Sequence, residues 1–138
     1  MDNHNKIPEY LEWLTIAEDD LELARIILKE GRCIPPAIFH TQQCAEKALK
    51  AYLTYMQQRA PKIHDLIELV AMCQEHDASF ASLIKLAASL NPFITSSRYP
   101  NIYCIPSQIT LKISIDEAQE ILNVVKDCID RLERKRGA

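Results

Sequence analysis

The chain has 138 residues, of which 48% are hydrophobic and 25% are charged, and this composition fits one globular domain spanning residues 1–138. Its net charge of -3 argues against a surface built throughout to hold nucleic acid, so any such site must be a local patch. No apolar run reaches the roughly 20 residues of a membrane span, and the polar start lacks the pattern of a signal peptide. We therefore expect a cytoplasmic protein without a membrane partner.

The first half of the chain predicts two long helices. Apolar residues recur at helical spacing from about residue 8 to residue 29, and Gly31 then supplies a helix stop. Pro35 and Pro36 suit the first turn of a second helix, because the missing N–H of proline is not needed there. We expect this second helix to end near Gln57.

The middle of the chain predicts shorter helices separated by capping residues. Asp65, with Glu68 three residues later, resembles a capping box at the start of a third helix, which should run to about residue 75. Asp77 is expected to cap a continuation over residues 78–90. These signals place helix starts directly after polar residues.

The last part of the chain predicts a long loop followed by a helix. Residues 93–112 show no helical periodicity, and connections of this length are often functional. Ser114 and Glu117 form a second capping-box pattern, which predicts a last helix from Ile115 to about Lys135. The sequence as a whole therefore predicts an all-α fold, an up-down antiparallel bundle of four to five helices with a long loop before the last one.

Metal and cofactor chemistry has little support in the sequence. The five cysteines are scattered without a Cys-x-x-Cys pair, which favours reduced thiols over zinc or redox chemistry. The four histidines lack metal-ligand spacing. With only two glycines, the chain has no Gly-rich phosphate loop. We expect neither a metal nor a cofactor.

The second predicted helix carries a row of polar residues that we call the polar stripe: His40, Gln43, Lys47 and Lys50. Steps of three, four and three residues place them on one helix face. One interpretation is a solvated face on which Glu46 and Lys50 form a surface pair that contributes about 0.2–0.5 kcal/mol. The alternative is a binding surface.

Four blocks of the sequence carry a resemblance to a known family. They are WLTIAEDDLELAR at residues 13–25, FHTQQCAEKALKAYL at 39–53, PKIHDL at 61–66 and RYP at 98–100. In this order the chain resembles the HEPN domain family, in the subgroup associated with minimal nucleotidyltransferases. The resemblance implies a helical bundle that forms a homodimer and pairs with a minimal nucleotidyltransferase in toxin and antitoxin systems.

Many members of that family are metal-independent ribonucleases with an arginine followed, after four to six residues, by a histidine. The histidine can move the proton of the 2′-hydroxyl while the arginine holds the phosphate. Here Arg98 is the matching arginine, but the positions that should hold the histidine are Tyr103, Cys104 and Ile105. Tyrosine, with a pKa of about 10, is a poor base near neutral pH. The ribonuclease motif is therefore degenerate.

A literal match to the motif occurs elsewhere, since His64 follows Arg59 at the required spacing. In the resemblance this histidine lies between the second and third helices and not beside the catalytic loop. We therefore interpret His64 first as a residue that pins the start of the third helix, with its ring bonded to backbone or to a neighbouring carboxylate.

Three hypotheses follow. The first is a dimeric module that binds nucleotide, RNA or a partner protein through Gln43, Lys47, Lys50 and Tyr99, because cations beside aromatic rings favour a phosphate with a stacked base. The second is a metal-independent RNA endonuclease in which Arg98 acts with His40 or His64. The third is a purely structural dimerisation module.

Overall fold

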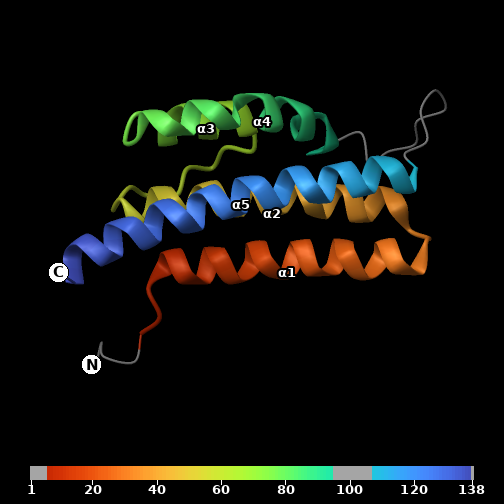
Figure 1. The fold of residues 1–138 in the computed structure, drawn as a ribbon, viewed down its shortest axis with the longest axis horizontal. Coiled ribbons are helices and arrows are strands. Elements are labelled where there is room, and N and C mark those ends of the chain that lie inside the picture. The colour runs from red at the N-terminus through yellow and green to blue at the C-terminus, as the bar shows by residue number, and fades with distance from the viewer. Residues whose placement is uncertain (1–5, 95–106, 138) are drawn as a thin grey trace.

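The computed structural model describes residues 6–94 and 107–137, and the regular structure in these ranges is helical (Figure 1). The elements, in chain order, are α1 (Glu9–Glu30), α2 (Ile34–Tyr55), α3 (Leu66–Gln74), the 3-10 helix η2 (Ala78–Leu83), α4 (Ile84–Leu90), the 3-10 helix η3 (Asn91–Ile94) and α5 (Gln108–Gly137). The predicted all-α bundle is confirmed. None of the helices in the described ranges is both long enough and apolar enough to cross a membrane.

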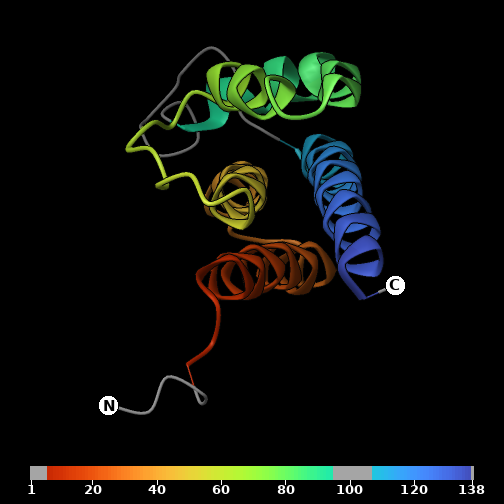
Figure 2. The same ribbon diagram turned by 90° about the vertical axis from the view of Figure 1, so that its left-hand side faces the viewer.

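Helix α2 lies at the centre of the bundle. Figure 2 shows α2 between α1 on one side and the layer of α3 and α4 on the other, with α5 along a third side. Helices α2 and α5 run in the same direction, and α1 runs antiparallel to both (Figure 1). The segment between α2 and α3 turns back along α2 before α3 begins, and this segment becomes important for the candidate site.

The predicted helix ends in the first two-thirds of the chain are confirmed. Gly31 ends α1 in the left-handed conformation at φ 73°, where a Cβ would also lie 2.8 Å from the side chain of Gln108 on α5. The Asp65 carboxylate accepts hydrogen bonds from the N–H groups of Ile67 and Glu68, and thereby caps α3. Asp77 accepts from the Ser79 N–H in the same way at the start of η2.

The predicted start of the last helix is wrong. Helix α5 begins at Gln108 instead of Ile115, and Ser114 lies inside it, 1% exposed, with its hydroxyl donating to the Thr110 carbonyl. The cap is formed by Ser107, whose hydroxyl accepts from the Thr110 N–H at 3.3 Å while the Thr110 hydroxyl accepts from the Ser107 N–H at 3.4 Å. The expected loop over residues 93–112 is shortened from both ends, because η3 also occupies its first two residues.

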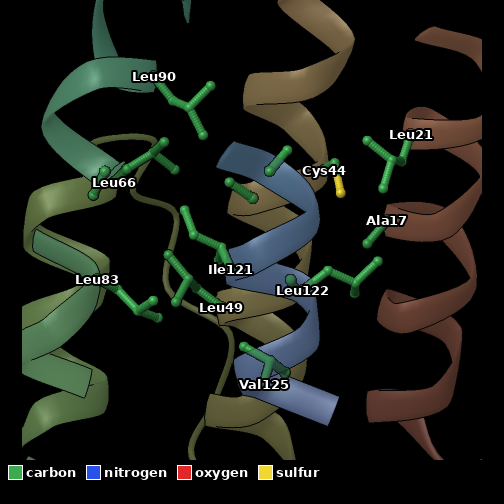
Figure 3. Close-up of a cluster of buried hydrophobic side chains, with 14 of the residues drawn as sticks. Ala17, Leu21, Cys44, Leu49, Leu66, Leu83, Leu90, Ile121, Leu122 and Val125 are labelled. Atoms are coloured by element: carbon green, nitrogen blue, oxygen red, sulfur yellow. The ribbon is translucent and has the colours of Figure 1, made fainter. Parts of the chain in front are cut away.

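One hydrophobic core joins the helices. Figure 3 shows Cys44 of α2 facing Ala17 and Leu21 of α1, while Leu66 and Leu83 approach from the α3 and η2 side. Ile121, Leu122 and Val125 of α5 complete this cluster, and all but Leu21 and Leu122 are fully buried. Most of α2 is therefore covered, and only a narrow part of its surface remains for function.

Thiol reactivity should report this packing. Cys33 is exposed, whereas Cys44 and Cys73 are buried, and burial raises the pKa of each of these two thiols to about 12. Because the thiolate is the reactive form, N-ethylmaleimide at pH 8 should label Cys33 rapidly and leave Cys44 and Cys73 unlabelled in the folded protein. Peptide mass spectrometry checks this result, with a urea-unfolded sample as the control in which all sites react. Labelling of Cys44 at the rate of Cys33 would contradict the packing.

Candidate functional site

The polar stripe is partly enclosed. His40, Gln43 and Lys47 are half-buried, whereas Lys50 is only 5% exposed. The Lys50 ammonium lies 5.8 Å from the centre of the Trp13 ring on α1, in a cation–π contact. The stripe therefore has a closed end near Lys50 and a more open part near Lys47.

Glu46 is the charged centre of the closed end. Its side chain is 3% exposed, and it accepts a hydrogen bond from Lys50 Nζ at 3.1 Å. The second partner is His64, whose Nδ1 lies 3.1 Å from Glu46 Oε1. The solvated-face interpretation is wrong for this pair, because Glu46 and Lys50 form a buried ion pair and not a surface pair. A sequence pattern cannot show this, since the residues that cover the pair come from α1 and from the segment before α3.

Two glutamines extend the network from Glu46 to the open part of the stripe. Gln42 donates to the backbone carbonyl of His64 at 3.3 Å and accepts from Gln43 at 2.7 Å. Gln43 in turn accepts from Lys47 Nζ at 2.6 Å. The segment that carries His64 is thus held on α2 by both its ring and its backbone. An ammonium has three donors, so Lys47 keeps donors that a ligand can use.

His40 takes part in a second carboxylate contact. Its Nδ1 lies 2.9 Å from Asp20 Oδ1 on α1, and the two side chains are 30% and 16% exposed. This pairing was not predicted, because Asp20 is 20 residues away in sequence and belongs to another helix. Its physical effect is to fix the ring orientation and the tautomer of His40.

His64 matches the predicted structural contact. Its ring bonds to a neighbouring carboxylate, as one interpretation expected, and Asp65 directly after it caps α3. The ring is nevertheless 63% exposed. With Nδ1 on the Glu46 carboxylate, Nε2 is the ring nitrogen that can meet a ligand, which is the arrangement of an oriented acid or base. Arg59, in the same segment, is exposed.

Arg98 and Tyr99 lie outside the described residues, and so do Tyr103, Cys104 and Ile105. The proximity of Arg98 to His40 or His64 therefore stays a prediction, as does the binding role of Tyr99. Within residues 6–94 and 107–137, no group of three histidine, cysteine, aspartate or glutamate side chains is arranged to hold a metal ion.

The buried pair should contribute much more to stability than an exposed pair at the same spacing. Lys50→Ala leaves the Glu46 carboxylate buried with two donors, His64 and Gln43, whose Nε2 lies 3.5 Å from Glu46 Oε1. We therefore expect the free energy of unfolding to fall by about 3 kcal/mol. The matched control is Lys112→Ala, which removes an exposed pair with Asp116, also four residues away, and should cost about 0.3–0.5 kcal/mol. Urea unfolding of both variants measures the difference. Equal losses would mean that the Glu46–Lys50 pair is not buried in solution.

The same arrangement of helices occurs in solved structures. The chain superimposes on the protein TT1696 from Thermus thermophilus with a TM-score of 0.78 at 25% identity, covering 88% of this chain and 98% of that one. It also superimposes on ST0689, described as an archaeal HEPN homologue, with a TM-score of 0.70 at 30% identity, covering 89% of this chain and 99% of that one.

A curated relative shares a shorter segment. A protein of Methanocaldococcus jannaschii named "Putative toxin MJ1304" is 51% identical over 37 residues, which is 27% of this chain and 24% of that protein. The matched segment thus spans about a quarter of the relative. The model of the HEPN domain matches residues 10–135 of this chain. Together with the fold, this match shows that the chain belongs to the HEPN domain family.

Proposed function

We propose that the chain is the HEPN component of a toxin–antitoxin-type pair, and that it acts as a homodimer that binds RNA or a nucleotide through the open part of the polar stripe. Its protein partner in this proposal is a minimal nucleotidyltransferase, as the family resemblance implies. The toxin name of the M. jannaschii relative supports the association with such pairs.

Lys47 carries the proposal. It is half-buried, and its ammonium bonds to a neutral amide, Gln43, instead of a carboxylate. Within the described ranges no acidic group lies within ion-pair distance of Lys47, whereas Lys50 is neutralised by Glu46. An unpaired cation that is held in place by neighbouring side chains attracts a phosphate at little entropic cost.

The other residues of the stripe have different roles in this proposal. Gln43 positions the Lys47 ammonium and can exchange its amide bonds with a base or a phosphate. Lys50 makes no direct contact in this proposal, because its side chain is 6% exposed and its charge is paired with Glu46. Arg98 and Tyr99, predicted to supply a second cation and a stacking ring, remain part of the proposal.

Removal of the Lys47 charge should weaken RNA binding. For Lys47→Ala we expect the affinity for a fluorescein-labelled 12-nucleotide single-stranded RNA to fall by about tenfold, the equivalent of one charge-assisted hydrogen bond. The slope of log affinity against log salt concentration should also fall by about one unit. Fluorescence anisotropy at several salt concentrations measures both quantities.

Lys85→Ala is the matched control, because Lys85 on α4 is exposed and its loss changes the net charge equally. This variant should bind as the wild type does. If Lys47→Ala and Lys85→Ala lose equal RNA affinity, only net charge matters, and the binding role of the stripe would then be abandoned.

The proposed homodimer is tested separately by light scattering on the same samples, which should give the mass of two chains.

A second candidate function is metal-independent cleavage of RNA. The observation that favours it is the Glu46–His64 contact, which orients an exposed imidazole as a general acid or base requires. In this candidate, Arg98 holds the phosphate and His64, or alternatively His40, replaces the missing histidine of the family motif. Tyr103 then has no catalytic part.

Cleavage in the presence of EDTA distinguishes the two functions. If His64 is the base, His64→Ala should reduce the rate by roughly 10²–10⁴-fold, and Arg98→Ala should also be inactive, while His40→Ala retains activity. Because Lys50 still donates to the buried Glu46 carboxylate in this variant, the helical circular dichroism should stay unchanged. A wild-type protein that binds the RNA but leaves it intact would reject the endonuclease and keep the binding module.

A further inference from the structure

The outer side of α1 carries a row of exposed side chains that lies away from the other helices. Figures 1 and 2 show α1 at one edge of the bundle, with α2 and α5 on its inner side. Steps of four and three residues place the members of the row on one face of the helix. We call this set the outer row: Glu12, Ile16, Asp19, Leu23, Ile26 and Glu30.

Three side chains of the outer row are large and apolar. Ile16, Leu23 and Ile26 are 46%, 40% and 49% exposed. Single exposed apolar side chains are ordinary on a protein surface, but here three of them share one helix face within about three turns. Alternating steps of four and three residues form the seam by which one helix packs along another. The outer row therefore has the geometry of a surface for a further helix.

The same face of α1 is acidic. The outer row contains Glu12, Asp19 and Glu30, and the row beside it contains Glu22 and Lys29. Over the described part of the chain, no cation lies within ion-pair distance of these four carboxylates. Helix α1 has seven acidic and two basic residues, a net charge of -5, whereas the whole chain has a net charge of -3. The negative charge of the chain is thus concentrated on α1.

The cations that line the groove between α1 and α5 do not cancel this charge. Two of them already have carboxylate partners, at 3.3 and 3.2 Å, in the pairs Lys126–Glu18 and Lys112–Asp116. Arg25 bonds to a neutral amide, that of Gln119, at 2.6 Å. Arg25 and Lys29 thus stand against four carboxylates that have no cation, and an excess of two negative charges remains.

The charges argue against a second copy of this chain as the occupant of the outer row. An antiparallel pairing that places Ile16 of each α1 opposite Ile26 of the other also places Glu12 opposite Glu30, twice. A parallel pairing places Asp19 opposite its own copy. Like charges at such positions destabilise a helix pair. The outer row is therefore not complementary to itself, and it matches a helix that carries cations.

We propose that the outer row of α1 is the docking surface for a cationic amphipathic helix of a partner protein. The apolar side chains of that helix meet Ile16, Leu23 and Ile26, and its lysines or arginines meet Asp19 and the flanking carboxylates. A cation opposite Asp19 fixes the register of the two helices, as a single polar residue does in a coiled-coil seam. The proposal rests on the protein partner in the proposed function, but not on RNA binding, because the outer row shares no residue with the polar stripe.

Binding of a designed peptide tests the proposal. The probe is a fluorescein-labelled helical peptide of three heptads, with leucine along its seam, one lysine at the central seam position and lysines on both flanks. The control peptide has glutamate in place of each lysine. Fluorescence anisotropy should show that the wild type binds the lysine peptide at least about tenfold more tightly than the glutamate peptide, because only the lysine peptide complements the acidic face.

A charge reversal tests the polar part of the surface. Asp19→Lys should reduce the affinity for the lysine peptide by about tenfold and raise the affinity for the glutamate peptide. The matched control is Glu120→Lys, because Glu120 is exposed on α5 and its replacement changes the net charge equally. This variant should bind both peptides as the wild type does.

A truncation tests the apolar part of the surface. Leu23→Ala should reduce the affinity for the lysine peptide by about tenfold. Ile84→Ala is the control, since Ile84 lies on α4 and is also 40% exposed. It should leave the affinity unchanged. The RNA affinity of Leu23→Ala should equal that of the wild type, so a failure of peptide binding and a failure of RNA binding are separate results.

Three outcomes would overturn the proposal. The first is equal affinity of the wild type for the two peptides, or no binding of either at millimolar concentration. The second is an equal loss in Asp19→Lys and Glu120→Lys, which would mean that only net charge matters. The third comes from light scattering on Leu23→Ala: a fall from the mass of two chains to that of one would assign the outer row to a second copy of the chain.

Discussion

The buried carboxylate of Glu46 constrains where three parts of the chain can lie. A carboxylate in the protein interior is stable only when hydrogen-bond donors surround it. Lys50 supplies one donor from the next turn of α2, and His64 supplies another from the segment before α3. Trp13 of α1 covers the Lys50 ammonium. The Glu46 carboxylate and its partners thus bring α1, α2 and that segment together at a single place.

The apolar side of α2 allows this meeting. Ala45, Ala48 and Ala51 are all completely buried, and small side chains let neighbouring helices approach closely. On α1, Ala17 and Ala24 have the same role. Close packing on one side and a charged network on another leave α2 little freedom to move. Such rigidity would favour the proposed binding role of the stripe, because ordered side chains lose little entropy when a ligand binds.

The sequence predicted the helix ends well wherever a local side chain or glycine forms the cap. Asp65, Asp77 and Gly31 act within a few residues of the backbone groups that they satisfy, so their effect is visible in the sequence. Ser114 shows the limit of this method. A serine followed by an acidic residue fits a capping box equally well inside a helix, where its hydroxyl bonds back to a carbonyl one turn earlier. Only the fold of the preceding residues distinguishes the two cases.

The candidate site was predictable as a set of residues but not as an arrangement. The sequence spacing placed Lys47 and Lys50 on one stripe and gave no reason to expect different exposure or a different role for either lysine. The structure separates them, because Trp13 and His64, both distant in sequence, cover the Lys50 end and leave Lys47 half-open. His40 gained an acidic partner for the same reason, since its neighbour Asp20 belongs to α1.

This separation changes what a mutational test of the stripe can show. Replacing the whole stripe by alanine would remove Lys50 together with Lys47. The loss of Lys50 would leave the buried Glu46 carboxylate without its ion-pair partner. Weaker binding by such a variant would then reflect damaged packing as much as a missing contact. The charge of Lys50 stabilises the fold, whereas the charge of Lys47 has no acidic partner among the described residues. A structural module would have no need of the second charge, so the behaviour of Lys47 alone decides between a binding surface and a scaffold.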